Sequence, residues 1–99
     1  MLPKFRSPTH PGVLVADMLE GLGLTQVDLA KRLGIPLQRL NTIIKGKRGV
    51  SADTALRLAK VFGTTPELWL NLQMAVDLWG AQQNATGLSK LKTIKRKAA

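Results

Sequence analysis

Apolar and polar residues follow the period of an α-helix most clearly between residues 25 and 45. Apolar positions recur three or four residues apart in two successive stretches, 25–33 and 36–45, which is the spacing of helices with one buried face. The side chains expected to face inward are Val27, Leu29, Ala30 and Leu33 in the first stretch and Leu40, Ile43 and Ile44 in the second. The pattern therefore predicts two short amphipathic helices in succession.

The residues around the junction of these two helices indicate a tight turn. Thr25 can cap the first of them, and Gly34 can adopt the left-handed conformation that ends it. Ala30 is small enough for the two helices to cross closely, and Pro36 fits the first turn of the second helix. Together these features predict a helix-turn-helix whose second helix has a polar outer face suited to the DNA major groove.

Three more helices are expected on either side of this unit. One covers residues 12–20 and is ended by Gly21 and Gly23. Another begins at the capping residue Ser51 and stops before Gly63, and the last begins at Thr65 with a proline and an acid behind it. The expected core positions are Val13 or Leu14, Met18 and Leu19 in the first helix and Ala55, Leu56, Leu58, Ala59 and Phe62 in the fourth.

These elements predict an all-α, five-helix domain over residues 12–80. The preceding residues 1–11 contain three prolines and are expected to form an irregular arm. Residues 81–99 are expected to form a linker, from Gly80 to Gly87, and a basic tail of low order. Apolar residues recur three apart in the tail, so an amphipathic helix is one interpretation and a mobile, DNA-attracting tail the other.

The fifth helix carries more apolar residues than one buried stripe requires. Its tryptophans, Trp69 and Trp79, are ten residues apart, so they lie about 80° apart around the helix axis. One can belong to the core while the other faces a partner. We therefore hypothesise a homodimer whose interface includes Trp69, Leu72, Val76 and Trp79.

The charge of the chain favours a polyanionic partner. Lysine and arginine number 15 against 6 acids, a net charge of +9. The basic residues gather in 25–48 and again in 90–97, whereas 50–80 is balanced. The excess charge therefore lies on the predicted DNA-reading unit and on the tail.

Composition argues against several other classes of protein. With no cysteine, one histidine and six scattered carboxylates, no acid/base pair or metal-ligand cluster is apparent, so neither an enzyme, a metal nor a cofactor is expected. His10 is expected to order the start of the first helix instead. The chain has no long apolar run and no signal-peptide pattern, so we expect a cytoplasmic protein without a membrane partner.

The third helix provides the candidate DNA contacts. With its apolar stripe facing the core, Gln38, Thr42 and Lys45 point most nearly outward. A glutamine is suited to adenine, an arginine to guanine or phosphate, and a threonine or leucine to a thymine methyl. The predicted base-contacting residues are Leu37, Gln38, Arg39 and Thr42, and the predicted phosphate-contacting residues are Gln26, Asn41, Lys45, Lys47 and Arg48. The alternative for any one of them is an ordinary solvated surface position.

Three segments resemble a known family. They are His10–Gly12, Gly21–Gln26 and Ile43–Trp79, and the similarity covers roughly residues 9–79. In these segments the chain resembles the lambda-repressor-like, Xre-type helix-turn-helix proteins and, among them, the HigA (VapI-like) antitoxins. The resemblance implies a five-helix fold, a homodimer that binds an inverted-repeat operator and represses its own operon, and neutralisation of a HigB-type ribonuclease toxin. It also implies that Gln26 positions the DNA backbone.

The chain departs from the family pattern in two places. Family members often have a polar residue where Leu37 stands, so a direct hydrogen bond from that position to a base is lost here. The lysine-rich tail lies outside the shared pattern. A stand-alone Xre-type or phage-like regulator without a toxin remains the alternative function, and acids such as Asp17, Glu20 and Asp28 are candidates for contact with a basic toxin.

Overall fold

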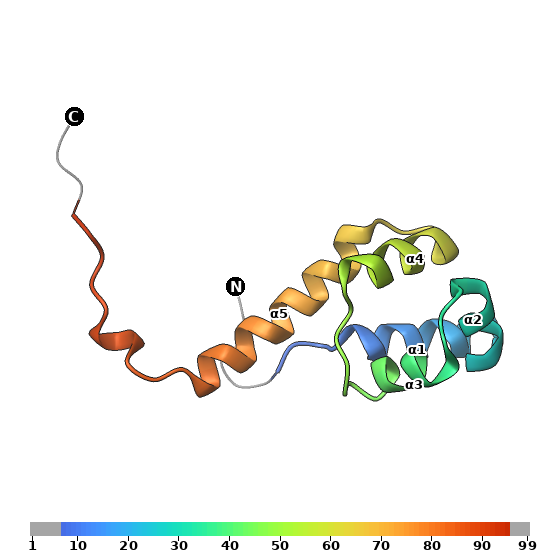
Figure 1. Cartoon of the computed structure of the whole chain (residues 1–99), viewed down its shortest axis with the longest axis horizontal. Coiled ribbons are helices and arrows are strands. Elements are labelled where there is room, and N and C mark those ends of the chain that lie inside the picture. The colour runs from blue at the N-terminus through green and yellow to red at the C-terminus, as the bar shows by residue number, and fades with distance from the viewer. Residues whose placement is uncertain (1–6, 96–99) are drawn as a thin grey trace.

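The computed structural model describes residues 7–95, which form an all-helical bundle with no strand in that range (Figure 1). The elements are α1 (Pro11–Leu22), α2 (Gln26–Leu33), α3 (Leu37–Ile44), α4 (Ala52–Phe62), α5 (Pro66–Asn84) and the short 3₁₀ helix η1 (Leu88–Lys90). The predicted all-α, five-helix architecture is confirmed. Residues 1–6 of the predicted arm and residues 96–99 of the tail lie outside the described range.

Side chains at the helix starts explain why the predicted boundaries are close to the observed ones. Thr25, Ser51 and Thr65 each accept a hydrogen bond from the backbone N–H three residues later, which supplies a partner for a donor that has none within the helix. At the other end of α1, Gly23 adopts the left-handed conformation with φ of 67°. Gly21, in contrast, lies inside α1, so the predicted end of that helix was too early.

The hydrophobic core lies among α1–α4 and is closed by the first turns of α5. Its cluster of thirteen buried hydrophobic residues comprises Val15, Leu19, Leu29, Ala30, Leu33, Ile35, Leu40, Ile43, Val50, Ala55, Leu58, Ala59 and Trp69. Trp69 is 0% exposed, and its ring lies 5.9 Å from that of Phe62. Its indole N–H donates to the Thr64 hydroxyl at 2.8 Å, so this large side chain is buried without an unpaired donor.

Two predicted core positions, Val27 and Leu56, face outward instead, with exposed fractions of 46% and 60%. Of the alternatives Val13 and Leu14, Leu14 packs against the core and Val13 is about half exposed. In α1 the buried positions are Pro11, Gly12, Val15 and Leu19, and Val15 was not among the predicted ones. Several apolar residues stand in each of these helices, and their spacing alone cannot decide which of two neighbouring stripes meets another helix.

A glycine allows α1 and α3 to approach closely. A Cβ atom on Gly12 would lie 2.0 Å from the carbonyl oxygen of Ile43, far inside van der Waals contact. The backbones can meet at this point because residue 12 has no side chain. This contact holds the end of the helix-turn-helix against the start of α1.

The C-terminal end of the fifth helix was also predicted too early. It continues through Gly80 to Asn84, whose side-chain amide donates to the Gly80 carbonyl at 3.0 Å. A single glycine costs only about 1 kcal/mol within a helix, so it did not end this one. The last turns extend beyond the four-helix body, and the exposed tail follows them (Figure 1). Within residues 7–95 no helix is long and apolar enough to cross a membrane.

Candidate nucleic-acid interface

The outer face of α3 and the loop that follows it form one continuous surface. Pro36, Gln38, Arg39, Thr42 and Arg48 line a shallow concavity there. Four of these residues are among the predicted DNA contacts, and Leu37 lies exposed beside them at the start of α3. The fold therefore gathers the predicted base-contacting residues on one exposed face.

The first helix of the unit is joined to the second by a pair of amide side chains. The Asn41 Nδ2 donates to Gln26 Oε1 at 3.2 Å. This bond uses the oxygen of the Gln26 amide, so its N–H groups are the end available for an acceptor such as a phosphate. Gln26 is the first residue of α2, where helix N–H groups also attract an anion. Asn41 thus orients Gln26, a role that sequence analysis did not predict.

Arg39 does not extend freely from the surface. Its Nη2 donates to the Thr54 hydroxyl and lies 3.6 Å from a carboxylate oxygen of Asp53. The arginine side chain is 27% exposed. Its neighbour on the same face, Thr42, donates its hydroxyl to the Arg39 carbonyl at 2.8 Å, so this hydroxyl has already given its proton within the helix.

The basic loop after α3 is folded back on its own helix. The backbone N–H groups of Lys47 and Arg48 both donate to the Thr42 carbonyl, at 2.9 and 3.2 Å. Gly46 permits this turn with φ of 75°. Lys45, Lys47 and Arg48 are all exposed, so three predicted phosphate-contacting residues lie together beside the concave face.

Gln73 of α5 holds the far end of this loop and was not predicted to have a role. Its Oε1 accepts a hydrogen bond from the Val50 N–H at 2.8 Å, and its Nε2 donates to Asp77 at 2.9 Å. A Cβ on Gly49 would lie 3.0 Å from the same amide. No local sequence signal indicates such a contact, because the bonded residues are 23 positions apart.

His10 caps α1, as predicted from the sequence. Its Nδ1 accepts a hydrogen bond from the Gly12 N–H at 2.9 Å. Burial lowers the pKa of the imidazole below 6.5, and the nearby Asp77 carboxylate partly opposes that shift. Across residues 7–95 there is no group of three or more histidine, cysteine or acidic residues that could hold a metal ion.

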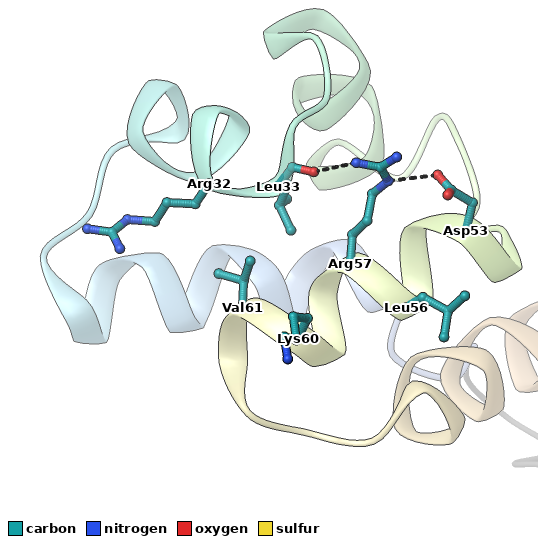
Figure 2. Close-up of a pocket in the computed structure, with 7 residues that line it drawn as sticks. All are labelled: Arg32, Leu33, Asp53, Leu56, Arg57, Lys60 and Val61. Carbon is teal, nitrogen blue, oxygen red and sulfur yellow. Dashed lines mark hydrogen bonds and ion pairs between the residues drawn. The ribbon is translucent and has the colours of Figure 1, made fainter.

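A second concave surface lies between α2 and α4 (Figure 2). Its central residue is Arg57, whose Nη1 donates to the Leu33 carbonyl at 2.9 Å and whose Nε donates to Asp53 at 3.0 Å. The arginine provides a partner for a carbonyl at the end of α2 and ties that helix to α4. The other lining residues are Arg32, Leu56, Lys60 and Val61.

The predicted dimer surface needs one correction. Trp69 is wholly buried inside the chain, so it is a core residue and cannot offer its ring to a partner. Leu72, Val76 and Trp79 are each partly exposed on α5. Met74 and Leu78 of the same helix are about half exposed, but at about 100° per residue they lie on the opposite side of α5 from Leu72, Val76 and Trp79.

The chain is similar to known helix-turn-helix proteins over most of its length. A helix-turn-helix family model matches residues 15–69. Antitoxin HigA-1 of Vibrio cholerae is 42% identical over 76 residues, covering 75% of this chain and 70% of that protein.

Two solved structures extend the similarity to the fold. An addiction module antidote protein of the HigA family from Coxiella burnetii is 44% identical, with a TM-score of 0.81 over 91% of this chain and 100% of that one. PA4674 of Pseudomonas aeruginosa, solved in complex with its operator DNA, is 31% identical, with a TM-score of 0.80 over 88% and 97% of the two chains. The chain therefore belongs to the helix-turn-helix family of DNA-binding regulators and, within it, to the HigA antitoxins.

Proposed function

We propose that this protein is an antitoxin that binds, as a homodimer, an inverted-repeat operator of its own operon and represses it. In the same proposal it neutralises a HigB-type ribonuclease toxin. The observation that carries the DNA-binding part is the gathering of Gln38, Arg39, Thr42 and Arg48 on one concave face. Two relatives support the proposal. PA4674 was solved in complex with its operator DNA, and HigA-1 is an antitoxin by name.

In this proposal the α3 face reads bases and its surroundings hold phosphates. Gln38 pairs with adenine and Arg39 with guanine in the proposed complex, while Leu37 contacts a thymine methyl. Thr42 offers its methyl group and the acceptor side of its hydroxyl. Gln26 and the basic loop of Lys45, Lys47 and Arg48 bind phosphates, which provides affinity without sequence choice. Asn41 acts through its hydrogen bond to Gln26.

The proposed dimer forms through the exposed apolar side of α5. Its members are Leu72, Val76 and Trp79, which share one stripe of the helix and are each partly exposed. A two-fold dimer would place the two copies of α3 in successive major grooves, about 34–36 Å apart. Sedimentation at micromolar concentration should give a dimer, and Val76→Glu should give a monomer that binds the operator less tightly. A monomeric wild-type protein would contradict the proposed interface.

Two observations support toxin binding: HigA-1 of Vibrio cholerae is an antitoxin by name, and exposed acidic side chains of this chain suit a basic partner. Asp17 and Glu20 are exposed on α1 and could meet a basic ribonuclease. Asp28 is exposed as well, but its carboxylate accepts from the Thr25 hydroxyl and backbone, and this capping contact lowers its pKa. Charge reversal at Asp17 and Glu20 should weaken the complex with a HigB-type toxin. Unchanged binding would remove α1 from the proposed contact.

The DNA-binding part is tested by titrating the protein with its own upstream DNA and with a shuffled duplex at two salt concentrations. We expect at least a ~10³-fold preference for the upstream DNA. Equal, steeply salt-dependent binding to both would mean that the charge acts without base reading. A stand-alone regulator would show the same preference, and the absence of any toxin gene beside this one would favour that alternative.

A further inference from the structure

We infer that Asp53 is a positioning residue for DNA recognition, which acts by restraining the guanidinium of Arg39. The carboxylate lies in the first turn of α4, behind the face that is proposed to read bases. The inference rests on the proposed role of Arg39 in base contact. It adds a residue that neither the third helix nor the basic loop contains.

The geometry restrains Arg39 from two sides. Its Nη2 donates to Thr54 Oγ1 and lies 3.6 Å from Asp53 Oδ2. Thr54 is itself fixed, because it is buried to 2% exposure and its hydroxyl oxygen accepts from the Ser51 hydroxyl at 3.2 Å. One end of the guanidinium is therefore fixed against α4, while Arg39 still lines the concave face.

The Asp53 carboxylate is in turn held by a second arginine. Arg57 Nε donates to the same Oδ2 atom at 3.0 Å, and Arg57 Nη1 donates to the Leu33 carbonyl at 2.9 Å (Figure 2). A chain of contacts thus runs from the end of α2 through Arg57 and Asp53 to the recognition helix. Because two arginines contact it, the Asp53 carboxylate is held in one position, unlike an acid that is free on the surface.

The restraint matters for discrimination because guanine is recognised by two parallel hydrogen bonds from a planar guanidinium. An unrestrained arginine can turn to a neighbouring phosphate, and phosphate contacts carry no sequence information. Asp53 is 58% exposed, so solvent screens its interaction and the effect is modest. Losing the restraint is expected to lower sequence preference without unfolding the protein.

The experiment measures the dissociation constants of upstream and shuffled DNA for the wild type, Asp53→Asn, Arg39→Gln and the double variant. The reported quantity is the ratio of the two constants, since removal of any acid raises affinity for both DNAs. Asp17→Asn, an exposed acid on α1, is the matched charge control. Thermal unfolding of each variant is measured alongside. Thr54→Val removes the other anchor of Arg39 and serves as the second test if Asp53→Asn does not fold.

We expect Asp53→Asn to lower the ratio roughly two- to fivefold, the range of an exposed ion pair, and to leave it unchanged in the Arg39→Gln background. Asp17→Asn should not change the ratio. Three results would overturn the inference: an unchanged ratio in Asp53→Asn, the same fall in the absence of Arg39, or a ratio that Arg39→Gln does not lower. If the wild type shows no preference for upstream DNA, the proposed function itself fails, which is a different and recognisable result.

Discussion

At the scale of single residues, two positions at or next to the start of α1 determine how the helix-turn-helix of α2 and α3 packs against that helix. Gly12 permits contact between the backbones of α1 and α3, and His10 caps the helix beside it. The glycine acts through the absence of a side chain, whereas the histidine acts through one nitrogen acceptor. Each therefore gives a prediction with a closely matched control.

Gly12→Ala is expected to destabilise the protein by about 3 kcal/mol, the upper range for overpacked sites. The new Cβ would meet the Ile43 carbonyl, which is backbone and cannot move without shifting α3. Chemical denaturation measures the free energy of unfolding. Gly21→Ala is the control in the same helix, where a Cβ meets nothing within 4 Å, and it should stabilise by about 0.5–1 kcal/mol. Equal stability of the two variants would contradict the close approach.

The stability of the protein should fall as pH is lowered from about 6.5 to the pKa of folded His10, and the contribution of this residue is fully lost below that pKa. Burial lowers the pKa of the folded imidazole relative to its ordinary value of 6.5, so the neutral ring is favoured by folding and its contribution is complete above that pH. Protonation puts a hydrogen on Nδ1, which then cannot accept from the Gly12 N–H.

The measurement for His10 is the free energy of unfolding at several pH values between 5 and 8, in the wild type and in His10→Asn. Asparagine can cap the helix but does not titrate in this range. The decline at acid pH should therefore be smaller in the variant. Identical pH profiles would show that another group is responsible.

At the scale of elements, α5 stabilises the basic loop that follows α3, residues 45–50. Gln73 accepts from the Val50 N–H and packs against Gly49, next to the exposed basic residues Lys47 and Arg48. The helix proposed to form the dimer interface is thus connected to the proposed phosphate contacts. Changes in α5 can reach DNA binding through this loop.

Gln73→Met is expected to weaken binding to upstream and shuffled DNA by a similar factor, roughly five- to tenfold if the loss matches one buried hydrogen bond. Methionine has a similar length but no strong acceptor for the Val50 N–H. The ratio of the two dissociation constants should stay unchanged, since phosphate contacts carry no sequence information. Gln83→Met, on the exposed end of α5, is the control and should leave both constants as they are.

At the scale of the whole molecule, the described part has a compact body and an extended C-terminal portion, and part of the positive charge lies on the tail. The described part has a compact body formed by α1–α4 and the start of α5, from which the rest of α5 and the tail project (Figure 1). Leu88, Leu91 and Ile94 of the tail are strongly exposed. The basic residues of the tail are Lys90, Lys92, Lys95, Arg96 and Lys97, with no acid among them.

Deleting residues 89–99 should weaken binding to upstream and shuffled DNA alike and reduce the salt dependence of both. Five positive charges are lost, and each phosphate contact contributes about 0.9 to the slope of log affinity against log salt. A tail of the same composition in scrambled order should restore both constants, because charge alone is responsible. A loss confined to upstream DNA would instead assign the tail a role in base reading.

The sequence by itself determined the helices and the surface chemistry, because both depend on capping residues and on the local spacing of apolar and polar residues. Caps such as Thr25 and Ser51 and the apolar period of 25–45 predicted the helix starts and the helix-turn-helix. Gln38 and Lys45, predicted to point outward from the third helix, are exposed. His10 was predicted to order the start of the first helix, and it does so through a bond to the Gly12 N–H only two residues away.

Only the tertiary structure decided which apolar stripe is buried and which polar groups meet. Val15, which was not predicted, is in the core, and Trp69 is enclosed and does not face a partner, because burial depends on where neighbouring helices pack. Asp53 forms an ion pair with Arg39, fourteen positions away in the sequence, and Gln73 accepts a hydrogen bond from Val50, 23 positions away. Such contacts depend on the crossing of helices, which no local pattern encodes, and they set how the residues that face DNA are held.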